Sequence, residues 1–157
     1  MIRILVALAV AVVLTAPALA QASKVDAKAL AKIQDCVKTK TGGNWESCIG
    51  IVSDSCTVRL SVTSEVTACI SREQAVWDDI LNETYRRLGE KLEPDQRHKL
   101  RDLQLAWITS REKTCAFYWD FFQGTMATPM SATCMNRETG RRALFLLGFL
   151  NDAPANK

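Results

Sequence analysis

Residues 66–115 read VTACISREQAVWDDILNETYRRLGEKLEPDQRHKLRDLQLAWITSREKTC, and this stretch decides the fold. Its apolar residues recur at spacings of three, four and seven, which is the period of one face of an α-helix. Pro94 interrupts the pattern, because proline is tolerated in the first turn of a helix and not in its interior. We therefore predict two long helices joined at residues 92–95. A connection this short makes the two helices antiparallel neighbours.

Polar side chains share one face of each predicted helix. Their spacings of three and four place three on the first helix and three on the second: Asp78, Asn82, Tyr85, Gln104, Trp107 and Arg111. Counting outward from the turn brings Asp78 opposite Arg111. We predict a polar clasp across the hairpin, with an Asp78–Arg111 ion pair at its centre. Such a clasp fixes the register of the helices; the alternative is a polar pocket that binds a ligand.

The first 20 residues have the features of a cleaved signal peptide. Arg3 provides a basic start, residues 4–14 are apolar, and Ala18-Leu19-Ala20 has the small-residue form that signal peptidase cuts. The apolar run is too short for a comfortable transmembrane span. We expect cleavage after Ala20, a periplasmic or secreted protein, and no transmembrane segment.

The mature part would keep six cysteines, and an even number in an exported chain favours disulfides. No C-x-x-C pair suggests a redox or zinc site. Local geometry favours pairs that close short loops: Cys36–Cys48, Cys56–Cys69 and Cys115–Cys134. The first two pairings remain open to exchange with each other.

The remaining chain predicts shorter helices at residues 25–37 and 45–56 and a last helix over residues 128–150. Residues 21–55 would form an N-terminal element, residues 56–150 the main helical domain, and residues 151–157 a loose tail. The fold class is therefore all-α, a small disulfide-braced antiparallel bundle built on the long hairpin. We expect the aromatic cluster to pack in the core: Phe117, Tyr118, Trp119, Phe121 and Phe122.

The sequence offers little catalytic chemistry. His98 is the one histidine and would have no free cysteine beside it, and no nucleotide-binding or hydrolase motif is present. Asp78 and Asp79 are adjacent in a helix, so their side chains diverge. We therefore expect no enzyme activity, no cofactor and no metal.

Charge also excludes some partners. Removing Arg3 from the 20 basic residues leaves 19 against 17 acidic residues. The two signs are interspersed, without the basic stripe of a nucleic-acid-binding protein. We expect no nucleic-acid partner, and a monomer or weak dimer.

One combination of spacings is distinctive: Cys56, Cys69, Asp78-x-x-Leu81-Asn82-x-x-Tyr85, Gln104-x-x-Trp107-x-x-x-Arg111-x-x-x-Cys115, and Cys134. This pattern resembles the LprI-type lysozyme inhibitor family of small exported bacterial proteins. The resemblance covers about residues 56–150. Two features depart from it: the Cys36/Cys48 segment is an addition, and Glu112 stands where the family often has aspartate.

The resemblance implies a helical fold and binding of lysozyme or another muramidase without catalysis. A rigid, disulfide-braced surface can block a sugar-binding cleft. The near-neutral chain gives no long-range attraction to the basic animal-type lysozymes, although a local acidic patch could compensate. The alternative is a periplasmic structural or envelope-stress protein with another partner; an enzyme using the Asp78–Arg111 region is a third hypothesis. A compact acidic or aromatic patch outside the disulfide clasps favours inhibition, and a broad apolar patch favours partner assembly. An open cleft containing Asp78, Tyr85 and Arg111 favours the enzyme.

Overall fold

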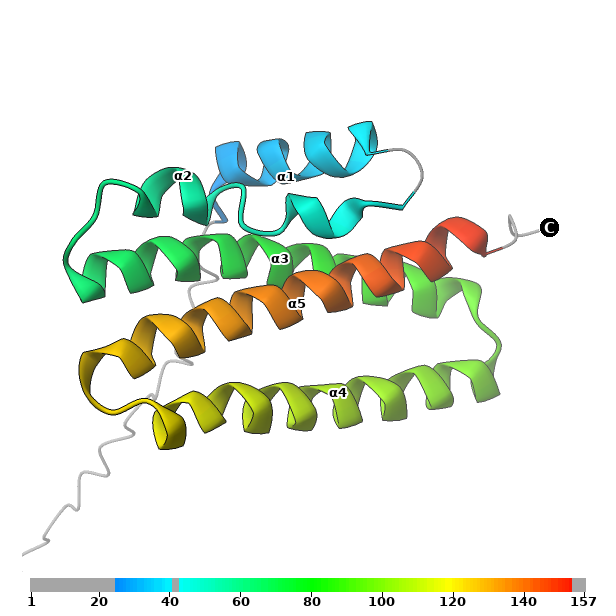
Figure 1. The fold of residues 1–157 in the computed structure, drawn as a ribbon. Coiled ribbons are helices and arrows are strands. Elements are labelled where there is room, and N and C mark those ends of the chain that lie inside the picture. Colours follow the sequence, from blue (N-terminus) through cyan, green and yellow to red (C-terminus); the bar gives the residue numbers. More distant parts are fainter. Residues whose placement is uncertain (1–24, 41–42, 154–157) are drawn as a thin grey trace, which may run out of the picture.

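The computed structural model describes residues 25–40 and 43–153, and this part of the chain is helical without strands. In chain order the elements are α1 (Ala27–Thr39), η1 (Trp45–Cys48), α2 (Ser53–Thr57), α3 (Thr63–Lys91), α4 (Pro94–Phe121), η2 (Gly124–Met126) and α5 (Ala127–Asp152), where η marks a 3-10 helix. Figure 1 shows the three long helices side by side, with α1, η1 and α2 across one side of α3. The predicted all-α, disulfide-braced fold is confirmed.

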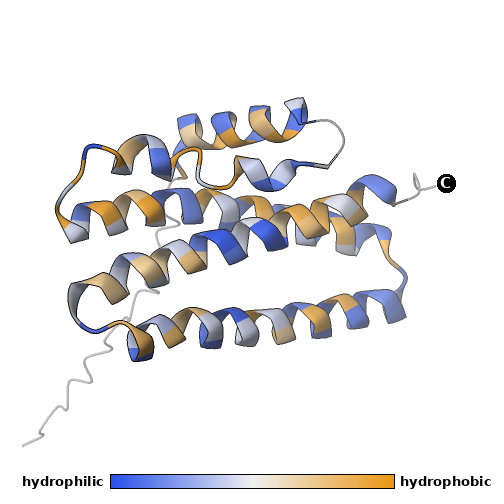
Figure 2. Ribbon diagram, viewed as in Figure 1, coloured by the Kyte–Doolittle hydropathy of each residue, from blue (hydrophilic) through white to orange (hydrophobic). Residues whose placement is uncertain are grey.

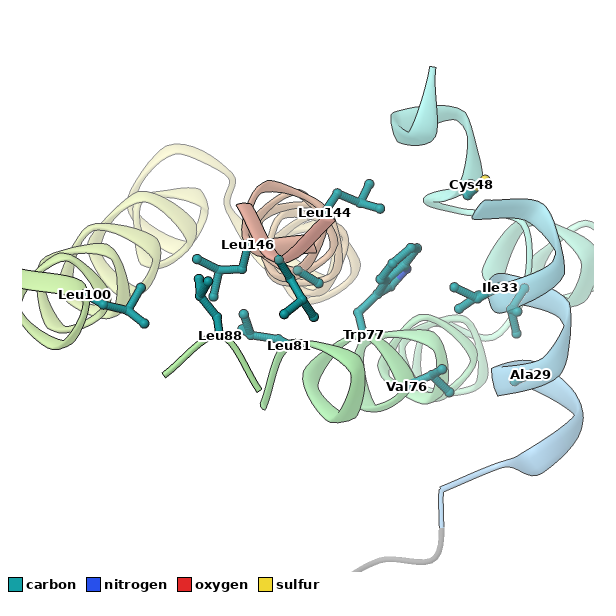
Figure 3. Close-up of a cluster of buried hydrophobic side chains, with 13 residues drawn as sticks. Ala29, Ile33, Cys48, Val76, Trp77, Leu81, Leu88, Leu100, Leu144 and Leu146 are labelled. Carbon is teal, nitrogen blue, oxygen red and sulfur yellow. The ribbon is translucent and has the colours of Figure 1, made fainter. Parts of the chain in front are cut away.

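The α3–α4 hairpin forms as predicted, with Pro94 at the start of α4. Glu93 and Gln96 form a reciprocal capping box there, which satisfies backbone N–H groups of the first turn. The two helices are not close neighbours along their length, however. The last helix, α5, packs against both α3 and α4 and lies between them (Figures 1 and 3). The structure is therefore a hairpin opened by a third helix.

The apolar core lies mainly between α3 and α5. Figure 3 shows Leu81 and Leu88 of α3 facing Leu146 of α5, and Leu100 approaching from α4. Trp77 is fully buried and extends toward α1. This core joins all of the α-helices except the short α2.

Close packing of α5 depends on Gly140. A Cβ atom at this position would lie 2.9 Å from Ile49 Cγ1 and 3.3 Å from a ring carbon of Trp77. Both distances are shorter than ordinary van der Waals contact. Glycine therefore allows α5 to approach both α3 and the segment after η1.

The short helix expected at residues 45–56 is wrong in part. The chain forms η1 and α2 instead, separated by residues 49–52. Gly50 has φ +103°, a conformation that favours glycine and that ends the helix. The break turns the backbone N–H groups of Gly50, Val52 and Ser53 toward one side chain, Glu73.

Glu73 is a fully buried carboxylate in the middle of α3. One oxygen accepts from the N–H groups of Val52 and Ser53 at 2.9 and 2.7 Å. The other accepts from Gly50 N, from Trp77 Nε1 at 3.0 Å and from Asn136 Nδ2 at 3.3 Å. Glu73 therefore ties the N-terminal segment to α3 and α5.

Three disulfides brace the helices, in the pairs that the cysteine spacing favours. Cys36–Cys48 joins α1 to η1, Cys56–Cys69 joins α2 to α3, and Cys115–Cys134 joins α4 to α5. Their Cα–Cα distances are 5.8, 6.2 and 5.4 Å. These lie within the usual range for disulfides.

The aromatic cluster is not a core, contrary to the prediction. Phe117, Trp119 and Phe121 are exposed, while Tyr118 and Phe122 are half-buried. The reason is that α4 packs mainly against α5, so it has one covered face. Within α4 itself, Leu100 and Cys115 are the buried residues.

Two further expectations concern the ends of the chain. The expected signal peptide lies outside the described residues, as does most of the expected tail. Within the described residues, no helix has the length and apolar character needed to cross a membrane.

Replacing Glu73 with glutamine should lower the free energy of unfolding by about 3 kcal/mol, because the buried N–H donors would lose a charged acceptor. Glu112→Gln is the control, since Glu112 is exposed. Urea denaturation of both variants measures the difference. Equal stabilities would contradict the anchoring role of Glu73.

The difference in unfolding free energy between the wild-type protein and Glu73→Gln should also depend on pH. Burial acts to raise the pKa of Glu73, but hydrogen bonds from Ser53, Gly50, Trp77 and Asn136 outweigh it, so the pKa lies below its ordinary value of 4.5. As the pH falls, the unfolded chain therefore takes up the proton first. The stability that Glu73 contributes is full above pH 4.5 and is lost as the pH falls through the lower folded-state pKa.

The difference in unfolding free energy between the wild-type protein and Glu73→Gln should thus be largest at neutral pH and shrink in acid. Denaturation curves at a series of acidic pH values measure this. A difference that stays constant down to strongly acidic pH would show that the carboxylate charge is not what stabilises the fold.

Candidate functional site

Five side chains from α4 and α5 meet around one indole ring. We call them the arginine–tryptophan cluster: Gln104, Trp107 and Arg111 of α4, with Thr139 and Arg142 of α5. They meet because residues 104, 107 and 111 share the face of α4 that α5 covers. On α5, Thr139 and Arg142 are three residues apart and so share a face as well.

Hydrogen bonds cross between the two helices within the cluster. Arg111 Nη1 donates to Thr139 Oγ1 at 3.0 Å, and Arg142 Nε donates to Gln104 Oε1 at 2.9 Å. Thr139 Oγ1 in turn donates to the carbonyl of Met135 at 2.7 Å. The cluster therefore fixes the register of α4 against α5.

Both guanidinium groups stack on aromatic rings. Arg111 Cζ lies 4.6 Å from the centroid of the Trp107 ring, and Arg142 Cζ lies 5.6 Å from it. Arg142 also lies 5.3 Å from the Phe145 centroid. Cation–π contacts of this kind stabilise a cation most strongly when it is removed from water.

The charges of the cluster are incompletely compensated. Arg142 is 7% exposed, and burial of its guanidinium lowers its pKa, partly offset by Tyr85. Among the residues that the structure describes, neither Arg111 nor Arg142 forms an ion pair. Arg111 Nε and Arg142 Nη2 are buried and have no hydrogen-bond partner within residues 25–40 and 43–153. Most buried polar groups have a partner, so these two nitrogens require an explanation.

The predicted Asp78–Arg111 ion pair is wrong. Asp78 is exposed on α3 and accepts a hydrogen bond from Asn82 of the same helix at 3.2 Å, while Arg111 turns to α5. The physical reason is that α5 fills the space between α3 and α4. The clasp therefore forms between α4 and α5, and Asp78 and Asn82 are not part of it.

Two members of the cluster, Thr139 and Arg142, are not among the residues that the sequence patterns single out. A usable signal exists in the last helix. Arg142 is four residues before Leu146 and eight before Leu150, and both leucines are buried. Helical spacing thus places Arg142 on the core face and Arg141 outside it.

A second feature is a group of exposed aromatic side chains near the end of α4. Phe117 and Phe121 are four residues apart and share one face, whereas Trp119, two residues from each, faces another way. We call Phe117, Trp119 and Phe121 the aromatic end of α4; they are 60%, 54% and 67% exposed. The rings of Phe117 and Phe121 lie 6.2 Å apart, and Phe121 contacts Phe122 edge to face at 5.0 Å. Figure 2 shows that apolar residues recur between polar ones along α4, including near its C-terminal end.

The described residues offer no candidate metal site. Within residues 25–40 and 43–153, histidine, cysteine and carboxylate side chains do not gather in a group that could hold an ion. The six cysteines are all in disulfides.

The position of the clasp can be tested with two substitutions. Asp78→Ala should change the free energy of unfolding by no more than about 0.5 kcal/mol, because Asp78 is exposed. Gln104→Ala should destabilise by about 1–3 kcal/mol, because Arg142 Nε would lose its acceptor. Thermal or urea unfolding measures both values. A large loss for Asp78→Ala would restore the clasp across the α3–α4 hairpin.

Comparison with known proteins gives one match. The family model described as lysozyme inhibitor LprI matches residues 54–146, which include α3, α4 and most of α5. No curated protein and no solved structure matches the chain. Since the matched region is more than half of the 157 residues, the chain belongs to the LprI lysozyme inhibitor family.

Proposed function

We propose that this protein is an exported, non-catalytic inhibitor that binds lysozyme or another muramidase through the aromatic end of α4. The observation that carries the proposal is the exposure of Phe117, Trp119 and Phe121 within the family-matched region. Adjoining exposed apolar side chains, such as Phe117 and Phe121, point to an interaction site more strongly than side chains exposed singly.

The aromatic end is held rigidly. Cys115, two residues before Phe117, is bonded to Cys134 of α5. Ser131 Oγ of α5 also donates to the carbonyl of Cys115 at 3.0 Å. A surface that is ordered before binding loses less conformational entropy on binding, which favours affinity.

The chemistry of the aromatic end suits a protein partner. Tryptophan is enriched among the residues that dominate binding energy in protein interfaces. Asp120 lies between Trp119 and Phe121 and is also exposed. Its carboxylate gives the aromatic surface a local negative charge, which would face favourably toward a basic lysozyme.

An extracytoplasmic location agrees with both the family and the disulfides, since disulfides persist in oxidising compartments. We propose that residues 1–20 direct export and are removed after Ala20, and that residues 21–55 form an added N-terminal element on the family domain. A family described by inhibition of an enzyme supports a binding role rather than catalysis.

A second candidate function is assembly with another envelope protein. It is favoured by exposed apolar residues outside the aromatic end, on α4 and α5: Leu103, Leu105, Phe145 and Phe149. Phe145 and Phe149 stack edge to face with their centroids 5.0 Å apart. Phe145 and Phe149 would then provide an apolar contact on α5 for such a partner.

The test is inhibition of a hen-type, a goose-type and a bacterial muramidase by the mature, oxidised protein. We expect saturable inhibition at stoichiometric concentrations of at least one enzyme. The double variant Trp119→Ala/Phe121→Ala should inhibit at least about tenfold more weakly, because aromatic contacts dominate such interfaces.

Leu105→Ala is the matched control. Leu105 is 52% exposed on the same helix, roughly 21 Å from Trp119 along the axis. Equal loss in the control and the double variant would contradict the assignment to the aromatic end. If the protein inhibits none of the three enzymes, the inhibitor proposal is rejected and an envelope partner is favoured.

A further inference from the structure

An open surface cavity lies beside the arginine–tryptophan cluster and includes Trp107 and Arg142 in its lining. Its volume is about 470 Å³, and residues of η1, α4 and α5 line it. The aromatic part of the lining consists of Trp45, Trp107 and Phe145. Cavities of this size hold small organic molecules.

The charged part of the lining contains one cation that lacks a counter-ion. Arg141, Glu46 and Glu138 all line the cavity, and Arg141 pairs with both carboxylates, at 3.5 and 3.2 Å. Arg142 lines the same cavity and has no such pair among the described residues. The four charges of the lining sum to zero, but both carboxylates face Arg141, so Arg142 is the lining cation that has no carboxylate partner among the described residues.

Arg142 is also short of acceptors. Gln104 accepts a hydrogen bond from Nε of Arg142, but Nη2 of Arg142 is buried and has no partner in the part of the chain that the structure describes. The rings of Trp107 and Phe145 contact the guanidinium, but they cannot replace hydrogen-bond acceptors in its plane. A buried charge with this little compensation is destabilising unless another group supplies an acceptor.

We propose that this cavity binds a small organic acid, a carboxylate attached to a six-membered ring, with Arg142 as the residue that recognises the carboxylate. The Nε of Arg142 already donates to Gln104 and its Nη2 is buried, so Nη1 is the nitrogen that would donate a charge-assisted hydrogen bond to the carboxylate. The ring of the ligand packs against the aromatic side chains of the lining. A ring and a carboxylate together match both the apolar and the cationic parts of the cavity.

Neighbouring residues explain why the site prefers a compact monoanion. Arg111 stacks on Trp107 from α4 and adds a further positive charge behind the two arginines of the lining. Glu46 and Glu138 remain near the entrance, although both face Arg141. These carboxylates would repel a more highly charged anion more strongly than a monoanion.

The test is titration of the mature, oxidised protein with phenylacetate, D-glucuronate and inorganic phosphate, followed by NMR of the tryptophan indole N–H signals. The chain has four tryptophans, so the signals locate the site. We expect saturable shifts of Trp45 and Trp107 with at least one ring acid at millimolar concentrations. Trp119, at the aromatic end, should not shift. Phenylacetate and glucuronate distinguish an aromatic from a sugar acid.

Arg142→Gln should raise the dissociation constant at least about tenfold. Phe145→Ala should also weaken binding, and it provides a variant that keeps the arginine, since Phe145 is 47% exposed and its loss leaves the core intact. Arg137→Gln is the charge control, because Arg137 is exposed on α5 and does not line this cavity.

Several results would overturn the proposal. They are the absence of saturable shifts with both ring acids, phosphate binding as tightly as either acid, or equal binding by wild-type protein and both cavity variants. The first result would mean that water alone solvates Arg142. None of these measurements uses lysozyme, so they are independent of the inhibitor proposal.

Discussion

Glu73 collects hydrogen bonds from three separate parts of the chain onto one buried carboxylate. The backbone of Gly50, Val52 and Ser53 donates from the N-terminal segment, Trp77 from α3 itself, and Asn136 from α5. Because each donor is buried or partly buried, loss of the carboxylate would leave several polar groups unpaired together. The position of η1 and α2 on the long helices depends on this single side chain, aided by the Cys56–Cys69 bond.

The arginine–tryptophan cluster contrasts with Glu73. The acid is fully satisfied, and its hydrogen bonds hold its pKa below the ordinary value even though burial acts in the opposite direction. Arg142 is nearly as buried but has one hydrogen-bond acceptor and two aromatic contacts. Incomplete pairing alone does not mark a binding site, because Asn136, a donor to Glu73, also keeps a buried oxygen without a partner among the described residues. What sets Arg142 apart is that it also lines a cavity.

The two surfaces proposed for binding have different origins. The aromatic end of α4 is exposed because α4 contacts one helix instead of two, and the Cys115–Cys134 bond keeps it in place. The cavity exists because η1, an element that precedes the family-matched residues 54–146, covers one side of α5. Inhibition of a muramidase would therefore be shared with the family domain, whereas the small-acid site would depend on the N-terminal addition.

Much of the fold could be predicted from sequence, because its determinants are local. The hairpin follows from apolar spacing and Pro94, and the cysteine pairs close short loops between consecutive elements. Helix 45–56 could not be predicted correctly, because its break depends on backbone donors turning toward Glu73, twenty or more residues away.

The candidate site was predicted in part. Gln104, Trp107 and Arg111 do share a face, as the spacing of three and four requires. Their partner could not be identified, because spacing along one helix does not say which other helix covers it. Sequence by itself determined the helices, their polar and apolar faces and the loops that the cysteines close. Tertiary structure alone decided that α5 lies between α3 and α4. As a result, Arg111 donates a hydrogen bond to Thr139 instead of pairing with Asp78, and the aromatic end stays exposed. The physical reason is that helix periodicity is a local property, whereas the choice of packing partner is made by all the helices together.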